Sequence, residues 1–150
     1  MESTMNELKL TAENKRSRDS AEWSRAKLNS YGGLILDAAI AVHTELGPGL
    51  LESIYERAMA RELELRGVRI RTQVPVEVKY KGVLLGKGYV MDMLVEEQII
   101  IEFKSVDLLQ PIFEAQLITY LKLADKRLGY LINFNVTLVK YGFKRLVYKF

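Results

Sequence analysis

The sequence predicts an α/β domain in which one mixed central β-sheet is flanked by helices. Two segments with helical periodicity come first, three strand-like segments follow, and one more helical segment precedes two final strands, giving the order α-α-β-β-β-α-β-β. A helix between two consecutive strands implies that they run parallel, whereas short turns imply antiparallel neighbours. A chain of 150 residues has the size of one such domain.

Two amphipathic helices are expected at the beginning of the domain. Apolar residues recur at three- and four-residue spacing across 31–46, which is the pattern of a helix with one buried face. Pro48, with a glycine on each side, ends this helix because proline cannot continue a helix and glycine permits the turn. The same periodicity returns across 50–65, and Gly67 is the expected stop.

Three strands joined by short turns are expected next. Valine alternates with other residues in 68–80, and a Lys-Gly turn leads into a second strand at 83–97. Gly86 and Gly88 within the second strand predict a bulge or a bend. The third strand, 99–105, begins with three isoleucines, which indicates burial on both faces.

A helix and two further strands complete the prediction. Pro111 stands at the favoured first-turn position of a helix that extends to residue 124. Strands are expected at 128–136 and 141–150. Lysine and arginine in the last strand discourage pairing with another chain, so we expect it at an edge of the sheet.

The first thirty residues differ from the rest of the chain. Residues 1–30 are mixed in charge and poor in branched aliphatic side chains, so we expect a polar leader, flexible or loosely helical, before a domain at 31–150. Cysteine is absent, which excludes disulfides and thiolate metal sites. No apolar run approaches the ~20 residues of a membrane helix. We therefore expect a cytoplasmic protein with no membrane partner.

Charge is distributed unevenly along the chain. Basic residues dominate 66–87, acidic residues dominate 88–121, and basic residues dominate again in 122–150. An acidic centre between basic flanks suits a site that binds divalent cations together with a polyanion. Ordinary surface charge is the alternative explanation.

Three charged residues interrupt apolar strands. Asp92 lies between two methionines, and Glu102 and Lys104 share one face of the third strand because strand side chains alternate. An uncompensated charge taken out of water costs several kcal/mol. Antiparallel pairing can bring Asp92 and Glu102 opposite each other, where two carboxylates repel unless one is protonated or a cation bridges them. Oxygen ligands are those that Mg²⁺ and Mn²⁺ prefer.

The helices offer further polar residues to the same place. Gln116 and Tyr120 are four residues apart and so share a helix face, and Glu52 stands near the start of the second helix. Each candidate also has a purely structural explanation. A glutamate in a first helical turn interacts well with the helix dipole, and Asp92 suits a turn at a strand end. The charged pair of the third strand suits an exposed face, and Gln116 and Tyr120 suit an ordinary helix surface.

The strand residues carry a family resemblance. Asp92, followed ten residues later by Glu-Phe-Lys at 102–104, resembles the signature of PD-(D/E)XK nucleases. A proline often precedes the aspartate in this superfamily, and Met91 stands there instead. The resemblance covers residues 34–147.

The helical residues extend this resemblance. Gln116 and Tyr120 resemble the QxxxY motif of the RecB-like branch of the superfamily. Gly49, Glu52 and Tyr55 are similar to the pattern that names the GxxExxY protein family, which is a PD-(D/E)XK-like group. The ordered set of motifs is far more specific than the strand signature alone.

The resemblance implies a restriction-endonuclease-like fold and cleavage of phosphodiester bonds with Mg²⁺ or Mn²⁺. Lys104 is expected to position the attacking water and to stabilise charge in the transition state. The expected metal ligands are the side chains of Asp92, Glu102 and Glu52 and the backbone carbonyl of Phe103. The expected catalytic set is Lys104, Glu102, Asp92, Gln116 and Glu52, and the residues expected to contact nucleic acid are Tyr55, Tyr120, Lys122, Lys126 and Arg127.

The function that the sequence predicts is that of a metal-dependent nuclease, with DNA favoured over RNA. The alternative is a catalytically silent module that binds nucleic acid or protein on the same fold, and a third interpretation is a structural domain with an ion-paired cleft. Exonuclease and endonuclease action both stay open. Any sequence specificity would come from the domain itself, from a homodimer or from another partner.

Overall fold

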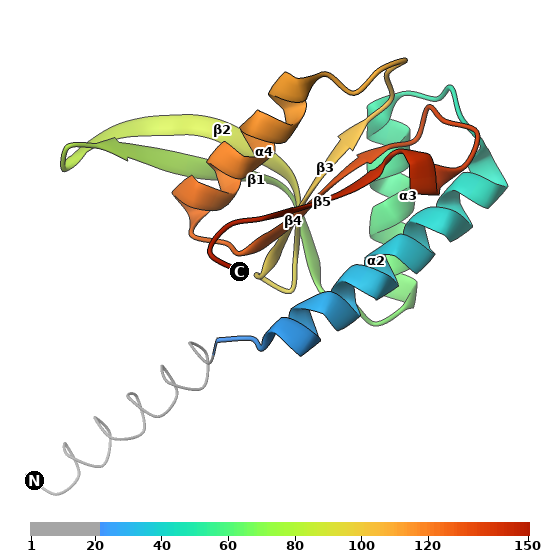
Figure 1. The fold of residues 1–150 in the computed structure, drawn as a ribbon, viewed down its shortest axis with the longest axis horizontal. Coiled ribbons are helices and arrows are strands. Elements are labelled where there is room, and N and C mark those ends of the chain that lie inside the picture. Colours follow the sequence, from blue (N-terminus) through green and yellow to red (C-terminus); the bar gives the residue numbers. More distant parts are fainter. Residues whose placement is uncertain (1–21) are drawn as a thin grey trace, which may run out of the picture.

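The computed structural model describes residues 22–150, which form a three-layer α/β structure (Figure 1). Five strands form one sheet whose spatial order is the same as the order in the chain. The elements are α2 (Arg25–Leu46), α3 (Glu52–Leu65), β1 (Ile70–Tyr80), β2 (Val83–Val95), β3 (Ile99–Lys104), α4 (Pro111–Ala124), β4 (Leu128–Asn133), the 3₁₀ helix η1 (Val139–Tyr141) and β5 (Phe143–Val147).

The predicted fold class is confirmed. Strands β3 and β4, which the helix α4 connects, run parallel, and all other neighbouring strands of this sheet run antiparallel. The last strand lies at an edge, as expected from its basic residues. The glycines of β2 coincide with two shifts in the β1–β2 register, between Val76 and Glu77 and between Val78 and Lys79.

The helices cover the two faces of the sheet with two separate apolar cores. The larger core lies between the sheet and the pair α2 and α3, and it includes Tyr55, Phe103 and Phe134. The smaller core lies beneath α4 and includes Leu94, Ile100 and Leu117. Because successive strand residues face opposite sides, Ile101 and Phe103 enter the first core whereas Ile100 enters the second. Glu102 therefore shares the face covered by α4.

Helix α2 begins earlier than the sequence pattern suggested. Its N-cap is Ser24, whose side chain accepts a hydrogen bond from the backbone N–H of Lys27, so residues 25–30 are helical. Trp23 packs against the larger core, and its carbonyl accepts a hydrogen bond from Arg127 at 2.6 Å. The part of the expected leader at 1–21 lies outside the described residues.

The loop after β3 is fixed by an asparagine at the end of β4. The Asn133 side chain accepts a hydrogen bond from the backbone N–H of Val106 at 3.1 Å and donates one to the carbonyl of Val106 at 2.9 Å. This double contact holds the chain immediately after Lys104.

Among residues 22–150, none of the helices combines the length and the apolar character that spanning a membrane requires.

Candidate active site

Strands β2 and β3 separate at the position of the predicted carboxylates. Their pairing ends at Met93 and Ile101, and the next residues are Asp92 and Glu102. Across the gap, Asp92 Oδ2 accepts a hydrogen bond from the backbone N–H of Phe103 at 2.9 Å, and Glu102 Oε1 accepts one from the backbone N–H of Asp92 at 3.2 Å. We call this arrangement of Asp92, Glu102 and Phe103 the strand fork. The two carboxylates take the place of ladder hydrogen bonds and thereby hold the strands apart.

The strand fork is electrostatically strained without a cation. Burial, and then the nearby Asp92 carboxylate, raise the pKa of Glu102 from its ordinary value of 4.5 to about 9. Lys104 opposes this shift, but its charge is the weakest of the contributions to the pKa. Two neighbouring carboxyl groups, one of which stays protonated at neutral pH, would repel each other if both were ionised. A divalent cation bound between them would relieve this repulsion.

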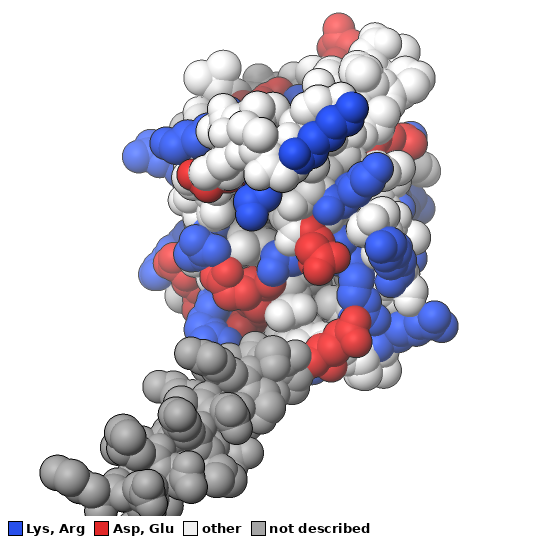
Figure 2. Space-filling view, turned by 90° about the vertical axis from the view of Figure 1, so that its left-hand side faces the viewer, with Lys and Arg blue, Asp and Glu red and all other residues white. Residues whose placement is uncertain are grey.

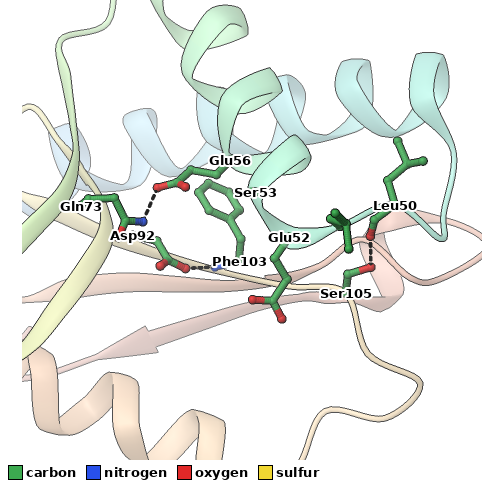
Figure 3. Close-up of a pocket in the computed structure, with 9 residues that line it drawn as sticks. Leu50, Glu52, Ser53, Glu56, Gln73, Asp92, Phe103 and Ser105 are labelled. Atoms are coloured by element: carbon green, nitrogen blue, oxygen red, sulfur yellow. Dashed lines mark hydrogen bonds between the residues drawn. The ribbon is translucent and has the colours of Figure 1, made fainter.

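A pocket of about 540 Å³ opens beside the strand fork, beneath the start of α3. Figure 3 shows Glu52 and Asp92 reaching into this pocket from the helix and from the strand, with Phe103 between them. Glu52 is the first residue of α3, so its carboxylate lies at the positive end of the helix dipole. The lining residues are Leu50, Leu51, Glu52, Ser53, Glu56, Gln73, Asp92, Phe103 and Ser105.

Lys104 reaches toward α4 rather than toward a carboxylate. Its Nζ lies 4.2 Å from the centre of the Phe113 ring, which is a cation–π contact. Among the described residues it forms no ion pair within 4.0 Å. The ammonium group is therefore held next to the strand fork by an aromatic face, and no described carboxylate competes with an anion for its hydrogen-bond donors.

The two motif residues of α4 have different surroundings. Gln116 is exposed and lies on the same helix face as Phe113 and Tyr120, because it is three residues after one and four before the other. Tyr120 stacks on Tyr89 with ring centres 3.9 Å apart, and the Tyr89 hydroxyl donates a hydrogen bond to the Tyr120 carbonyl at 2.9 Å. Burial, followed by the charges of Glu102 and Asp92, raises the pKa of Tyr120. The influence of both carboxylates places the Tyr120 hydroxyl near the strand fork, on the side of α4.

A comparison with family models agrees with this geometry. The model described as the PD-(D/E)XK nuclease superfamily matches residues 29–146. The chain belongs to the PD-(D/E)XK nuclease superfamily. Membership indicates nuclease chemistry, for which divalent metals such as Mg²⁺ are typical. No curated protein and no solved structure matches the chain.

The donor atoms at the strand fork fit a hard divalent cation such as this superfamily uses. Within residues 22–150, no group of three or more His, Asp and Glu side chains is gathered so as to hold a metal. The fork instead offers two carboxylates and a backbone carbonyl. In an extended strand the N–H and C=O of one residue point to the same side, so the Phe103 carbonyl faces the fork together with the N–H bound to Asp92. Mg²⁺ is commonly bound through one or two carboxylates, with water and substrate phosphate supplying the rest.

The structure corrects the role expected for Tyr55. Its side chain is fully buried and stacks on Phe134 with ring centres 4.4 Å apart, so it does not reach a nucleic acid. Its hydroxyl donates a hydrogen bond to the Gly47 carbonyl at 2.6 Å and accepts one from the Leu50 N–H at 3.1 Å. Tyr55 therefore shapes the turn that leads into Glu52.

Two of the basic residues expected to contact nucleic acid lie away from the strand fork. Lys126 and Arg127 precede β4, whose first residue pairs with Ile99 at the opposite end of β3 from Lys104. Arg127 binds the Trp23 carbonyl and forms an ion pair with Glu22 at 3.6 Å. These two side chains therefore do not surround the site that the carboxylates form.

Sequence reasoning missed three residues near the site. Glu56 lines the pocket and accepts a hydrogen bond from the Gln73 amide at 2.7 Å. The sequence did contain a signal for Glu56, because it stands one helical turn after Glu52 and so shares its helix face. Gln73 lies across from Asp92 with φ of 52°, a conformation that is uncommon outside glycine. Tyr89, the partner of Tyr120, had no signal in its local pattern because the contact joins a strand to a distant helix.

The hydroxyl of Tyr55 provides a test of how the turn before α3 is held. Tyr55→Phe leaves the stacked ring in place but removes the group that joins Gly47 to Leu50. We expect the free energy of unfolding to fall by about 1 kcal/mol, because a partly buried carbonyl and a partly buried N–H lose their partner. Chemical denaturation measures the change, with Tyr141→Phe on the exposed Tyr141 as control. Equal stability of the two variants would contradict this role.

Proposed function

We propose that the protein is a metal-dependent nuclease that hydrolyses phosphodiester bonds, with DNA as the favoured substrate. One observation carries the proposal: carboxylates from two diverging strands meet at the strand fork, and Lys104, which has no ion-pair partner among the described residues, follows Glu102 on the same face of its strand. Charged groups held together in this way destabilise the fold unless a bound ligand compensates their charge. Superfamily membership supports the same conclusion.

The strand fork is the proposed site for Mg²⁺ or Mn²⁺. Asp92, Glu102 and the Phe103 carbonyl would hold the ion, and Glu52 would contribute from the wall of the pocket. When bound, the ion would neutralise the paired carboxylates and stabilise negative charge that develops on the phosphate. Glu56, which accepts a hydrogen bond from Gln73, would add a negative charge to the pocket on the side of α3.

The remaining residues would bind and orient the reacting groups. Lys104, with no carboxylate partner among the described residues, would donate hydrogen bonds to a phosphate oxygen and orient the attacking water. Gln116 would orient the phosphate or Lys104 from the exposed face of α4. Tyr120, clamped by Tyr89, would exclude water from the carboxylates. We further assign Gln116 and Tyr120 to a QxxxY motif and Gly49, Glu52 and Tyr55 to a GxxExxY motif.

The proposal is tested by a cleavage assay on a panel of labelled nucleic acids. The panel contains single- and double-stranded DNA and RNA, each incubated with Mg²⁺, Mn²⁺ or EDTA. We expect cleavage of DNA with either metal and none with EDTA, and we expect Asp92→Asn to lose it while keeping the melting temperature. A parent protein that binds DNA but cleaves no member of the panel would favour a silent binding module. An active Asp92→Asn variant would place the site elsewhere.

A further inference from the structure

The hairpin formed by β1 and β2 extends beyond the rest of the sheet. The two strands pair from Ile70 and Val95 at the base to Tyr80 and Val83 at the tip, whereas β3 pairs with β2 only over Met93–Val95. Figure 1 shows the hairpin projecting to the left, away from β3, β4 and β5. Val76 and Tyr89 still pack against the core beneath α4. We call the outer part, residues 77–88, the β-ribbon arm.

The tip of the β-ribbon arm exposes large apolar side chains. Tyr80, Val83 and Leu85 have 61%, 60% and 64% of their surfaces accessible, and Leu84 is also exposed. A two-stranded hairpin gains little stability by itself, so exposed apolar residues at its tip are not explained by folding. Contiguous exposed apolar groups mark interaction sites.

The structure divides the basic residues of this region into a neutralised group and a free group. Near the base of the hairpin, each arginine forms an ion pair: Arg66 with Glu62, Arg69 with Glu96, and Arg71 with Glu97. On the arm, the exposed residues Lys79, Lys81 and Lys87 form no ion pair with any described residue. Glu77, across the ladder from Lys87, is the one acidic residue of the arm. Within segment 66–87, the positive charge that has no ion-pair partner among the described residues therefore lies on the arm.

A groove beside the arm adds another lysine. This groove of about 460 Å³ lies between the arm, the end of α4 and the C-terminal segment, and Lys79 and Lys122 both line it. Its remaining lining residues are Glu77, Leu84, Leu123 and Tyr148. Figure 2, which views the molecule from the side to which the hairpin projects, shows Lys and Arg side chains standing on a largely uncharged area in its upper half. Lysines around the apolar surface of the arm suit a polyanion that presents apolar groups next to its negative charges.

We propose that the β-ribbon arm grips duplex DNA beside the strand fork, by entering the major groove. The major groove of B-form DNA admits a two-stranded β-ribbon, where apolar side chains contact thymine methyl groups and lysines contact the flanking phosphates. The major groove of A-form RNA is too narrow for such an element. Asp92 lies on the same strand as the arm, so a duplex held by the arm lies next to the proposed catalytic residues. The inference rests on the proposed nuclease function for its substrate.

Binding without cleavage tests the arm. In EDTA, fluorescence anisotropy measures the affinity of labelled duplex DNA, single-stranded DNA and duplex RNA for the parent and for the combined variant Lys79→Ala, Lys81→Ala, Lys87→Ala. A matched control removes the same charge from exposed positions elsewhere, with Arg57→Ala, Arg61→Ala and Lys140→Ala. We expect the arm variant to lose at least about tenfold in affinity for duplex DNA at ~0.1 M salt, and the slope of log K against log salt to become less negative by about 2.7. The control should resemble the parent.

The apolar tip is tested separately. The combined variant Tyr80→Ser, Leu85→Ser should weaken duplex DNA binding with the salt slope unchanged, because it removes no charge.

Equal affinity of the arm and control variants for duplex DNA would overturn the inference. So would binding of duplex RNA by the parent that is as strong as its binding of duplex DNA. A parent dimer that the tip variant converts to monomer would assign the tip to a second copy of the chain instead. Duplex binding through the arm without cleavage in any metal would refute the nuclease proposal alone, and cleavage with unaltered binding by the arm variant would refute the arm alone.

Discussion

Replacing Lys104 with alanine is expected to lower the rate of metal-dependent cleavage by about 10²–10³-fold, which is the usual effect of removing one donor that stabilises charge in a transition state. The structural reason is that Lys104 follows Glu102 on the same strand face and has no carboxylate partner among the described residues. Its contact with the Phe113 ring at 4.2 Å holds the ammonium group without using its hydrogen bonds. On the proposed function, substrate phosphate is the anion for which this cation is positioned.

The measurement is single-turnover cleavage of labelled duplex DNA in Mn²⁺, compared with the parent protein. Lys140→Ala is the control, since Lys140 is an exposed lysine of the 3₁₀ helix η1 and lies outside the proposed site. The melting temperature should stay within a few degrees of the parent, because a half-buried lysine at a strand end adds little to the core. Cleavage by Lys104→Ala at the rate of the control would show that Lys104 takes no part in the reaction.

Local patterns were sufficient to predict the order of the α-helices and strands and the meeting of Asp92 with Glu102, but not the start of α2 or the 3₁₀ helix η1. Helical and strand periodicities depend on neighbours a few residues away, and a short turn between β2 and β3 fixes which residues face each other. Asp92 and Glu102 therefore met as expected. The helix between β3 and β4 likewise determined that these strands run parallel.

Features that depend on distant contacts were not predictable in the same way. Burial of Tyr55 follows from its stack on Phe134, a residue that enters the core only after β4 ends. Arg127 lies away from the strand fork because β4 begins beside Ile99, at the opposite end of β3 from Glu102. In the basic segment 66–87, the pair of Arg66 with Glu62 follows a local i,i+4 spacing. The ion pairs of Arg69 with Glu96 and of Arg71 with Glu97 join residues 27 and 26 positions apart, so no local pattern distinguished these arginines from the lysines of the arm.

Without metal, the stability of the protein is expected to fall as the pH rises from about 5 to about 9, and Glu102→Gln is expected to flatten this dependence. The folded protein keeps a proton on Glu102 because its pKa is raised to about 9, whereas the unfolded chain releases that proton near the ordinary pKa of 4.5. Between these two values the folded state binds more protons than the unfolded state, so each rise in pH favours unfolding. The contribution is complete below pH ~4.5 and lost above pH ~9. Urea denaturation at a series of pH values measures the slope, with Glu45→Gln on the exposed face of α2 as control.

A divalent cation should reverse the cost of ionising Glu102, which makes the same variant a test of the metal site. Mg²⁺ or Mn²⁺ at about one hundred times its dissociation constant stabilises a folded protein by about 2.7 kcal/mol, which corresponds to a rise of about 5 °C or more in melting temperature for a domain of this size. Glu102→Gln removes a negative charge from the strand fork, so the rise should be lost or strongly reduced, whereas Glu45→Gln should retain it. The effect in the parent should also be larger at pH ~8 than at pH ~5, because protons compete with the metal for the carboxylate. A metal-induced shift that is equal in Glu102→Gln and in the parent would mean that the ion binds elsewhere, and the carboxylates of β2 and β3 would then need another explanation.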